Sequence, residues 1–207
     1  SGKLVQLEPM DIKTAIEQTL RNYRLNATEK DVSLSKDIEE NIPSILGNWD
    51  LLLQVFDNLL GNGLKFSPKK STLMIRAYTW PDSCPALPPN HKEEAPQCEL
   101  VSPLPRVRVE IADTGCGISQ SDQDKIFDRF FRVENAVHTE QGTGLGLSIV
   151  RGIIQKHGGE IMMASELEIG TTFWFDLPLE QSDKDELLIK SINNEKYFDN
   201  SQVQELI

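Results

Sequence analysis

The sequence contains little cysteine and an excess of negative charge. Only 3 of its 207 residues are cysteines, and neither their odd number nor their spacing suits a structural disulfide or a metal site. We therefore expect reduced thiols in a cytoplasmic setting. The 32 acidic and 21 basic side chains give a formal net charge of -11. This charge argues against a nucleic-acid partner, because a sequence-independent surface of that kind needs a basic face.

Long apolar runs are also missing from the sequence. No run approaches the roughly 20 residues that cross a bilayer, and no signal peptide opens the chain, so we expect a soluble fragment. Ser1 and Gly2, without an initiator Met, are typical of the remnant of an expression tag and indicate a piece of a longer protein. Whether that protein is anchored in a membrane stays open. With 39% apolar residues, one α/β domain with a sizeable core is expected.

Hydrophobic periodicity predicts the order of the elements. The first half is expected to hold a helix from near Pro9, a short strand at Val32 and Leu34, a turn over 41–48, and a long amphipathic helix capped by Asn48 or Asp50 that ends before Pro68. The expected later elements are strands 72–80 and 107–113, helices 122–131 and 148–156, and strands 160–165 and 171–177. Core positions are expected at Ile126, Phe127, Phe130, Phe131, Ile149, Ile153 and Ile154.

Two segments differ in composition from this pattern. Residues 81–105 hold seven of the eleven prolines and are expected to be a long solvated insertion between two paired strands. A metal site there is disfavoured, since it offers only Cys84, His91 and Cys98 at irregular spacing. Residues 180–207 are expected to be an acidic tail that either docks as a helix or stays disordered.

The long helix carries a polar stripe opposite its apolar side. Asn58, Asn62 and Lys65 recur at helical spacing, and Gln54 extends the stripe one turn upstream. Taken alone, such a stripe is more often a solvated face. No carboxylate is expected on this face of the helix. A single Asn oxygen, from Asn62 or Asn58, suffices to bind a nucleotide-borne Mg²⁺, which keeps most of its waters, and Lys65 would neutralise phosphate.

Two glycine clusters strengthen the functional interpretation. DTGCGI (113–118) places Asp113 at a predicted strand end, where its carboxylate can accept a hydrogen bond from the exocyclic amine of adenine. Capping of an ordinary turn is an equally good explanation of Asp113 alone. GTGLGLS (142–148) precedes a predicted helix, whose free amides and positive dipole end favour phosphate oxygens.

The motifs NLLGNGLKFSP, DTGCGI, IFDRFFRV, GTGLGLSIV and HGGEI, followed by GTTFWFDLP, occur in this order. They resemble the N, G1, F and G2 boxes in the ATP-binding catalytic domain of sensor histidine kinases, within the superfamily that includes gyrase, Hsp90 and MutL. The resemblance covers roughly residues 4–179. Residues 133–178 also resemble an NblS-like cyanobacterial and plastid subgroup.

This resemblance implies an α+β fold, an α/β sandwich in which a mixed, mostly antiparallel sheet carries helices on one face. It implies a lead-in over 1–8 from a dimerisation domain and a catalytic domain over 9–179. ATP and Mg²⁺ are the implied cofactors, with Asn62 as the metal ligand and Asn58, Lys65 and Arg132 as catalytic residues. The implied ATP-binding residues are Asn58, Asn62, Lys65, Phe66, Asp113, Gly115, Gly117, Ile118, Gly142, Gly144, Leu145, Gly146, Leu147 and Thr171.

Two further sequence features bear on the reaction. The family's ATP-hydrolysing members have a Glu one helical turn before the Mg²⁺ ligand, and here that place holds Asn58, which cannot accept a proton. This favours a kinase over an ATPase. Neither His91, His138 nor His157 has the sequence context of a phosphoacceptor, so the acceptor is expected on a separate dimerisation domain of the longer protein.

That domain and, through it, a response regulator are the expected partners. The full-length protein is expected to be a homodimer and the fragment a monomer. A gyrase- or Hsp90-type ATPase and a non-catalytic nucleotide-binding or interaction module are the alternatives.

Overall fold

The structure, a computed structural model, describes residues 6–80, 106–133 and 143–180. Its elements, in chain order, are β1 (Glu8–Met10), α1 (Ile12–Lys30), β2 (Ser33–Ile38), β3 (Ile45–Gly47), α2 (Trp49–Phe66), β4 (Thr72–Trp80), β5 (Arg106–Asp113), α3 (Gln120–Gln123), α4 (Gly146–Lys156), β6 (Ile161–Glu166) and β7 (Gly170–Pro178). The predicted insertion 81–105, most of the predicted loop before the second glycine cluster, and the tail beyond Glu180 lie outside the described residues.

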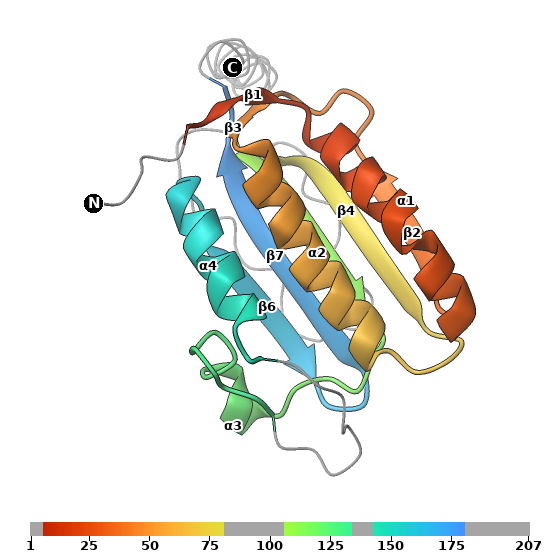
Figure 1. Cartoon of the computed structure of the whole chain (residues 1–207). Coiled ribbons are helices and arrows are strands. Elements are labelled where there is room, and N and C mark those ends of the chain that lie inside the picture. Colours follow the sequence, from red (N-terminus) through yellow and green to blue (C-terminus); the bar gives the residue numbers. More distant parts are fainter. Residues whose placement is uncertain (1–5, 81–105, 134–142, 181–207) are drawn as a thin grey trace, which may run out of the picture.

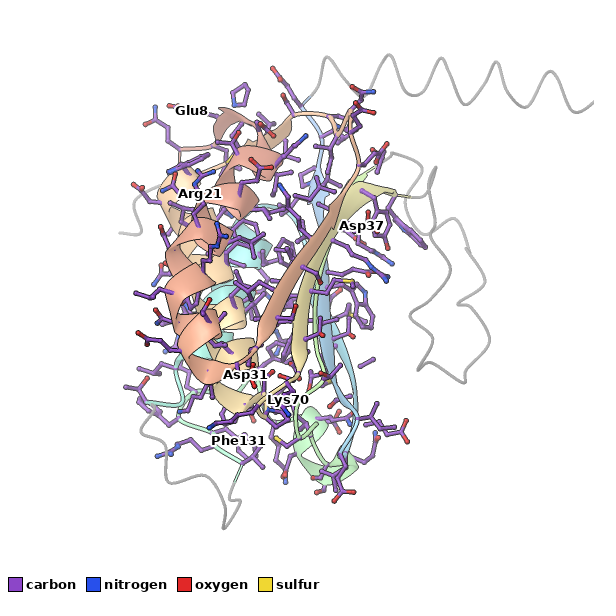
Figure 2. All side chains as sticks on the ribbon, turned by 90° about the vertical axis from the view of Figure 1, so that its right-hand side faces the viewer. Glu8, Arg21, Asp31, Asp37, Lys70 and Phe131 are labelled. Atoms are coloured by element: carbon purple, nitrogen blue, oxygen red, sulfur yellow. The ribbon has the colours of Figure 1, made fainter. Side chains whose placement is uncertain are left out.

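Five strands form the main sheet in the order β2-β4-β5-β7-β6. β2 runs parallel to β4, and the other neighbouring pairs are antiparallel. Helices α1, α2 and α4 cover one face of this sheet (Figure 1), and the side view shows helices and strands as two layers (Figure 2). The predicted mixed, mostly antiparallel sheet with helices on one face is confirmed.

The core lies between the two layers because each element has one apolar side. The central strands bury alternate residues toward the helices, as expected of a sheet with one covered face. Helix α2 fills the middle of this interface, and its buried residues follow the predicted apolar side: Leu52, Val55, Phe56, Leu59, Leu60, Gly63 and Leu64. A Cβ atom at Gly63 would lie 2.6 Å from Leu73 Cδ1 of β4. Glycine at this position therefore allows α2 to pack closely on the sheet.

The start of the chain differs from the prediction. Helix α1 begins at Ile12, where the Asp11 side chain accepts the Lys13 amide at 2.9 Å, whereas Pro9 lies in strand β1. The predicted turn over 41–48 contains β3, and Pro9 of β1 pairs with Leu46 of β3. This pairing joins distant segments, so local periodicity could not reveal it.

The segment after β5 also differs from the prediction. A helix was expected over 122–131, but the helical residues of this segment are Gln120–Gln123. Phe130 has a positive φ of 66° and is 71% exposed, while its amide donates to the Gly144 carbonyl at 2.9 Å. Contact with the second glycine cluster thus replaces the predicted helical conformation. Ile126 is buried as predicted, but Ile149, predicted to face the core, is 37% exposed.

The end of α2 is fixed by the end of α1. Lys30 Nζ donates to the carbonyls of Leu64 at 2.7 Å and Lys65 at 2.5 Å. The next turn is held by the Lys70 amide, which donates to the Asp31 carbonyl at 2.6 Å (both residues are labelled in Figure 2). As predicted, the helix ends at Phe66, two residues before Pro68.

Across the described ranges, no helix combines the length and apolar character needed to cross a membrane.

His157 joins the end of α4 to the start of α2. Its Nε2 accepts the Asn48 amide at 2.9 Å, and its Nδ1 lies 2.8 Å from the Ile153 carbonyl, which requires a neutral ring with the proton on Nδ1. The residue is buried, and this burial lowers the pKa of the imidazole below its ordinary 6.5. The Asn48 side chain in turn caps α2 by accepting the Leu51 amide at 3.1 Å, which confirms one of the two predicted caps.

We predict that His157→Phe lowers the free energy of unfolding by about 1–3 kcal/mol above neutral pH, because the part-buried Asn48 amide loses its acceptor. Below pH 6.5 this deficit should shrink. The unfolded chain binds a proton there that folded wild-type protein resists, so wild-type stability falls as the pH falls. Urea unfolding at several pH values measures both effects, with His157→Gln, which keeps an acceptor, as the control. A deficit that does not change with pH would contradict the assignment.

Candidate functional site

A cavity of about 400 Å³ opens between the C-terminal half of α2, the segment after β5 and the start of α4. The residues that line it are Asp57, Asn58, Gly61, Asn62, Gly63, Lys65, Phe66, Asp113, Cys116, Gly117, Ile118, Ile126, Phe131, Arg132, Val133, Thr143, Gly144, Gly146, Leu147, Thr171 and Phe173. The polar stripe and both glycine clusters therefore meet in one place. A more open groove between α1 and α2 shares Gly61 and Lys65 with it.

Most residues predicted to bind the nucleotide line this cavity. They are Asn58, Asn62, Lys65, Phe66, Asp113, Gly117, Ile118, Arg132, Gly144, Gly146, Leu147 and Thr171. Gly115 and Leu145, which were also predicted to belong to the nucleotide site, are not among the lining residues. Gly142 lies outside the described residues.

The polar stripe of α2 faces the start of α4. Asn58 Nδ2 donates to the Gln54 carbonyl at 2.8 Å, which directs this end of the amide to the helix backbone. A Cβ atom at Gly146 would lie 2.6 Å from Asn58 Oδ1. A side chain at position 146 would require the Asn58 amide to move. The two helices form one wall of the cavity.

The N-terminus of α4 is suited to bind anions. Its N-cap residue, Leu145, makes no side-chain capping bond, and Gly144, Gly146 and Leu147 line the cavity around it. The first amide groups of a helix lack intrahelical acceptors, and the helix dipole adds positive charge there. Gly144 has a φ of 69°, and a Cβ atom on it would lie 2.8 Å from the Phe130 carbonyl carbon. The geometry of this terminus therefore suits phosphate-like oxygens.

Asp113 lies at the opposite end of the cavity, on the last residue of β5. Its Oδ1 accepts the Gly115 amide at 2.9 Å and the Thr171 amide at 3.3 Å. Burial raises the pKa of the carboxyl from 3.8 to about 6, and the two amide donors oppose this rise. The group is therefore mostly ionised at pH 7 and offers a hydrogen-bond acceptor to a ligand.

The glycines after Asp113 have distinct structural roles. A Cβ atom at Gly115 would meet the Phe66 carbonyl oxygen at 2.8 Å, so this glycine allows the segment to pack against the end of α2. Gly117 has a φ of 67°, and a Cβ atom there would lie 2.0 Å from the Glu166 carbonyl oxygen. No other residue fits at Gly117 without displacing the backbone of the turn between β6 and β7.

Several lining residues were not predicted. Asp57 contradicts the expectation that no carboxylate occupies this face of α2, and burial raises the pKa of its side chain. Asp57 lies one helical turn before Gly61, on the same side of α2. The small residue at position 61 was the sequence feature that could have indicated that Asp57 lines the cavity. Cys116 could have been found because it lies within DTGCGI, whereas Phe173 and Val133 carry no local signal.

The donor set fits a magnesium ion that is carried by a nucleotide. Among the described residues, no group of three or more His, Cys, Asp or Glu side chains could hold a metal ion. An Asn62 oxygen is the single neutral donor predicted for this role, and it lines the cavity. Mg²⁺ retains several waters and is commonly bound by one or two protein groups together with substrate phosphates. The cavity therefore suits an ion that arrives with its own phosphate ligands.

Known proteins resemble this chain in sequence and in fold. Residues 47–181 match the family described as histidine kinase-, DNA gyrase B- and HSP90-like ATPase. The chain is 49% identical over 182 residues to Drug sensory protein A of Synechocystis sp., covering 88% of this chain and 26% of that protein. It is 50% identical over 171 residues to the uncharacterized sensor-like histidine kinase ycf26 of Pyropia yezoensis, covering 83% and 25%. The chain thus spans about a quarter of the length of these curated relatives.

A solved structure gives a matching fold. Full-length ShkA in complex with AMPPNP aligns with a TM-score of 0.64 at 26% sequence identity, over 84% of this chain and 31% of that one. The predicted fold class is confirmed by this likeness as well as by the sheet order.

We predict that the Asp113 carboxyl titrates with a midpoint near 6 rather than 3.8, as measured by carbon NMR of the ligand-free chain. The Asp113→Asn variant should also become more stable relative to wild type as the pH rises from 3.8 to about 6. The folded wild-type protein holds a proton there that the unfolded chain has released, so wild-type stability falls as the pH rises. Spectra of Asp113→Asn identify the resonance. A midpoint close to 3.8 would disprove the effect of burial.

Proposed function

The chain belongs to the histidine kinase-, DNA gyrase B- and HSP90-like ATPase family, and we propose that it binds ATP with Mg²⁺ and donates the γ-phosphoryl group to a histidine of a separate dimerisation domain. Its relatives identify it as the ATP-binding catalytic domain of a sensor histidine kinase of the predicted NblS-like group. The proposed division places a lead-in at 1–8 and the catalytic domain at 9–179, with the insertion 81–105 inside it and the tail at 180–207.

The two ends of the cavity suggest how the nucleotide lies. The ionised Asp113 would accept a hydrogen bond from the adenine amine, with Thr171 beside it. The phosphates would lie against the N-terminus of α4, where no side chain caps the helix. Asn62 would hold the Mg²⁺, which supplies charge stabilisation to the phosphates when bound. Lys65 and Arg132 would add positive charge around the transferred group.

The amide at position 58 is the observation that favours transfer to histidine over transfer to water. One helical turn before Asn62, Asn58 donates its Nδ2 hydrogen to the Gln54 carbonyl and has no basic group with which to activate water. Transfer then depends on a nucleophile supplied from outside, held in line with the phosphate by positioning and electrostatics.

The phosphoacceptor is proposed to lie on a dimerisation domain of the longer protein. His157 is buried and engaged at both ring nitrogens, so it cannot reach a nucleotide in the cavity. His91 and His138 lie outside the described residues. The proposed partners are that domain and, through it, a response regulator. We propose that the full-length protein is a homodimer and that the fragment alone is a monomer.

One feature favours an ATPase as the second candidate. Asp57 brings a carboxylate to the cavity next to Asn58, and burial raises its pKa, which makes it a stronger proton acceptor than an ordinary aspartate. Steady ATP turnover by the fragment that Asp57→Asn abolishes would support this candidate. Turnover that is slow and unaffected by Asp57→Asn would count against it.

We predict that Asn62→Ala weakens Mg²⁺-dependent ATP binding at least tenfold, about 1.4 kcal/mol, in isothermal titration calorimetry. The exposed Asn22→Ala on α1 removes the same amide away from the cavity and should bind as wild type does. Asp113→Ala should weaken ATP more than it weakens inorganic tripolyphosphate, because only ATP carries the base. Equal losses for both ligands would refute the adenine assignment, and no wild-type binding at millimolar ATP would refute the function.

The reaction itself is tested by adding a separately prepared helical hairpin that carries a phosphoacceptor histidine, taken from a curated relative. We expect label from γ-labelled ATP to appear on the hairpin and not on its His→Ala variant. Asn62→Ala should abolish the transfer. If label is released as phosphate at the same rate with and without the hairpin, the kinase assignment is wrong.

A further inference from the structure

We propose that Ser165 is a specificity-determining positioning residue, which orients the Thr171 hydroxyl so that the base end of the cavity selects a 6-aminopurine over a 6-oxopurine. This inference rests on the proposed function, since it concerns the same nucleotide. Ser165 belongs to strand β6, is paired with Thr171 of β7, and does not itself line the cavity. It acts on the base only through Thr171 and the segment after Asp113.

The Ser165 hydroxyl makes three polar contacts. Its Oγ accepts the Ile118 amide at 2.8 Å, donates to the Gly170 carbonyl at 2.9 Å, and lies 2.9 Å from Thr171 Oγ1. A hydroxyl has one proton and two lone pairs. The Gly170 carbonyl can only accept and the Ile118 amide can only donate, so the Ser165 proton and one lone pair are committed.

The donor in the hydrogen bond between Ser165 and Thr171 follows from this count of protons and lone pairs. The second lone pair of Ser165 Oγ faces Thr171 Oγ1, and Thr171 must be the donor because the Ser165 proton is used. The single hydroxyl proton of Thr171 therefore points away from the cavity that this residue lines. Toward a ligand, the Thr171 hydroxyl presents lone pairs only.

Asp113 completes a surface that only accepts hydrogen bonds. Its Oδ1 accepts two backbone amides, and the ionised carboxylate has no proton to donate. The 6-amino group of adenine is a donor, whereas guanine has a carbonyl oxygen, an acceptor, at the same position. A purine placed against these two residues therefore makes a hydrogen bond if it is adenine and meets lone-pair repulsion if it is guanine.

The surroundings of Ser165 keep this arrangement fixed. Gln123 Nε2 donates to the Ile118 carbonyl at 3.0 Å and to the Ser165 carbonyl at 2.9 Å. The segment after Asp113 and strand β6 are thus joined on both sides of the Ser165 hydroxyl. Rotation of Ser165 would leave the Ile118 amide without this acceptor, which is costly for a part-buried group.

Removal of the Ser165 hydroxyl should release the Thr171 proton. In Ser165→Ala, Thr171 can rotate its proton toward the cavity and donate to a 6-oxo group. We expect ATP affinity to fall by a few-fold and GTP affinity to rise, so that the ratio of ATP to GTP affinity decreases about tenfold, the usual scale for one such bond. Ser165→Thr restores a hydroxyl and should restore the preference.

The experiment is calorimetry of ATP, GTP and inorganic tripolyphosphate, each with Mg²⁺, on the full chain. Ser121→Ala, which removes an exposed serine hydroxyl of α3, is the matched control and should keep the wild-type ratio. Thr171→Val provides a second test that does not depend on whether Ser165→Ala folds. It removes the oriented hydroxyl and should also lower the ratio of ATP to GTP affinity.

The possible outcomes distinguish a failure of the proposed ATP-binding function from a failure of the role assigned to Ser165. Wild-type protein that binds no ATP would overturn the proposed function and this inference together. Wild-type protein that prefers ATP, with an unchanged ratio in Ser165→Ala and Thr171→Val, would overturn this inference alone. Equal weakening of ATP, GTP and tripolyphosphate in Ser165→Ala would also overturn it, because a purely structural role predicts that result. A lowered ratio with unchanged tripolyphosphate binding supports it.

Discussion

The packing of α2 against the centre of the sheet is the constraint on which the rest of the structure depends. Phe56 of α2 and Phe175 of β7 are both fully buried, with ring centroids 6.3 Å apart. Because this apolar side must face the strands, the rotation of the helix about its axis is fixed. Asn58 and Asn62 are then held at the edge of the core, where polar groups remain accessible. Burial of hydrocarbon thus positions the polar groups of the site.

The site combines two environments along one cavity. At the strand end, a desolvated carboxylate held by backbone amides accepts hydrogen bonds. At the helix end, the first amides of α4 line the cavity, and Lys65 and Arg132 add basic side chains to its lining. A ligand with a donor at one end and negative charge at the other fits this polarity, and an adenine nucleotide is such a ligand. The asymmetry arises from backbone geometry as much as from side chains, which explains the number of glycines around the cavity.

The sequence predicted α2, the paired strands β4 and β5, and most of the cavity lining, because each depends on local periodicity or on a short motif. β1 and β3 were missed because they pair across 35 or more residues with only three residues each. The helix expected over 122–131 was wrong because tertiary contact with Gly144 overrides local preference at Phe130. Asp57 was missed because it lies beside the regular polar stripe, and the role of Ser165 depends on hydrogen-bond direction, which no sequence pattern encodes.

The contact of Lys30 with the end of α2 has an electrostatic consequence for the site. The last carbonyls of a helix carry partial negative charge, and here they lie one residue from Phe66, which lines the cavity. A bare helix end at this position would repel a polyphosphate. The ammonium group bound to the Leu64 and Lys65 carbonyls offsets that field. Helix α1, which contributes no side chain to the cavity lining, therefore makes the cavity's potential more favourable to anions.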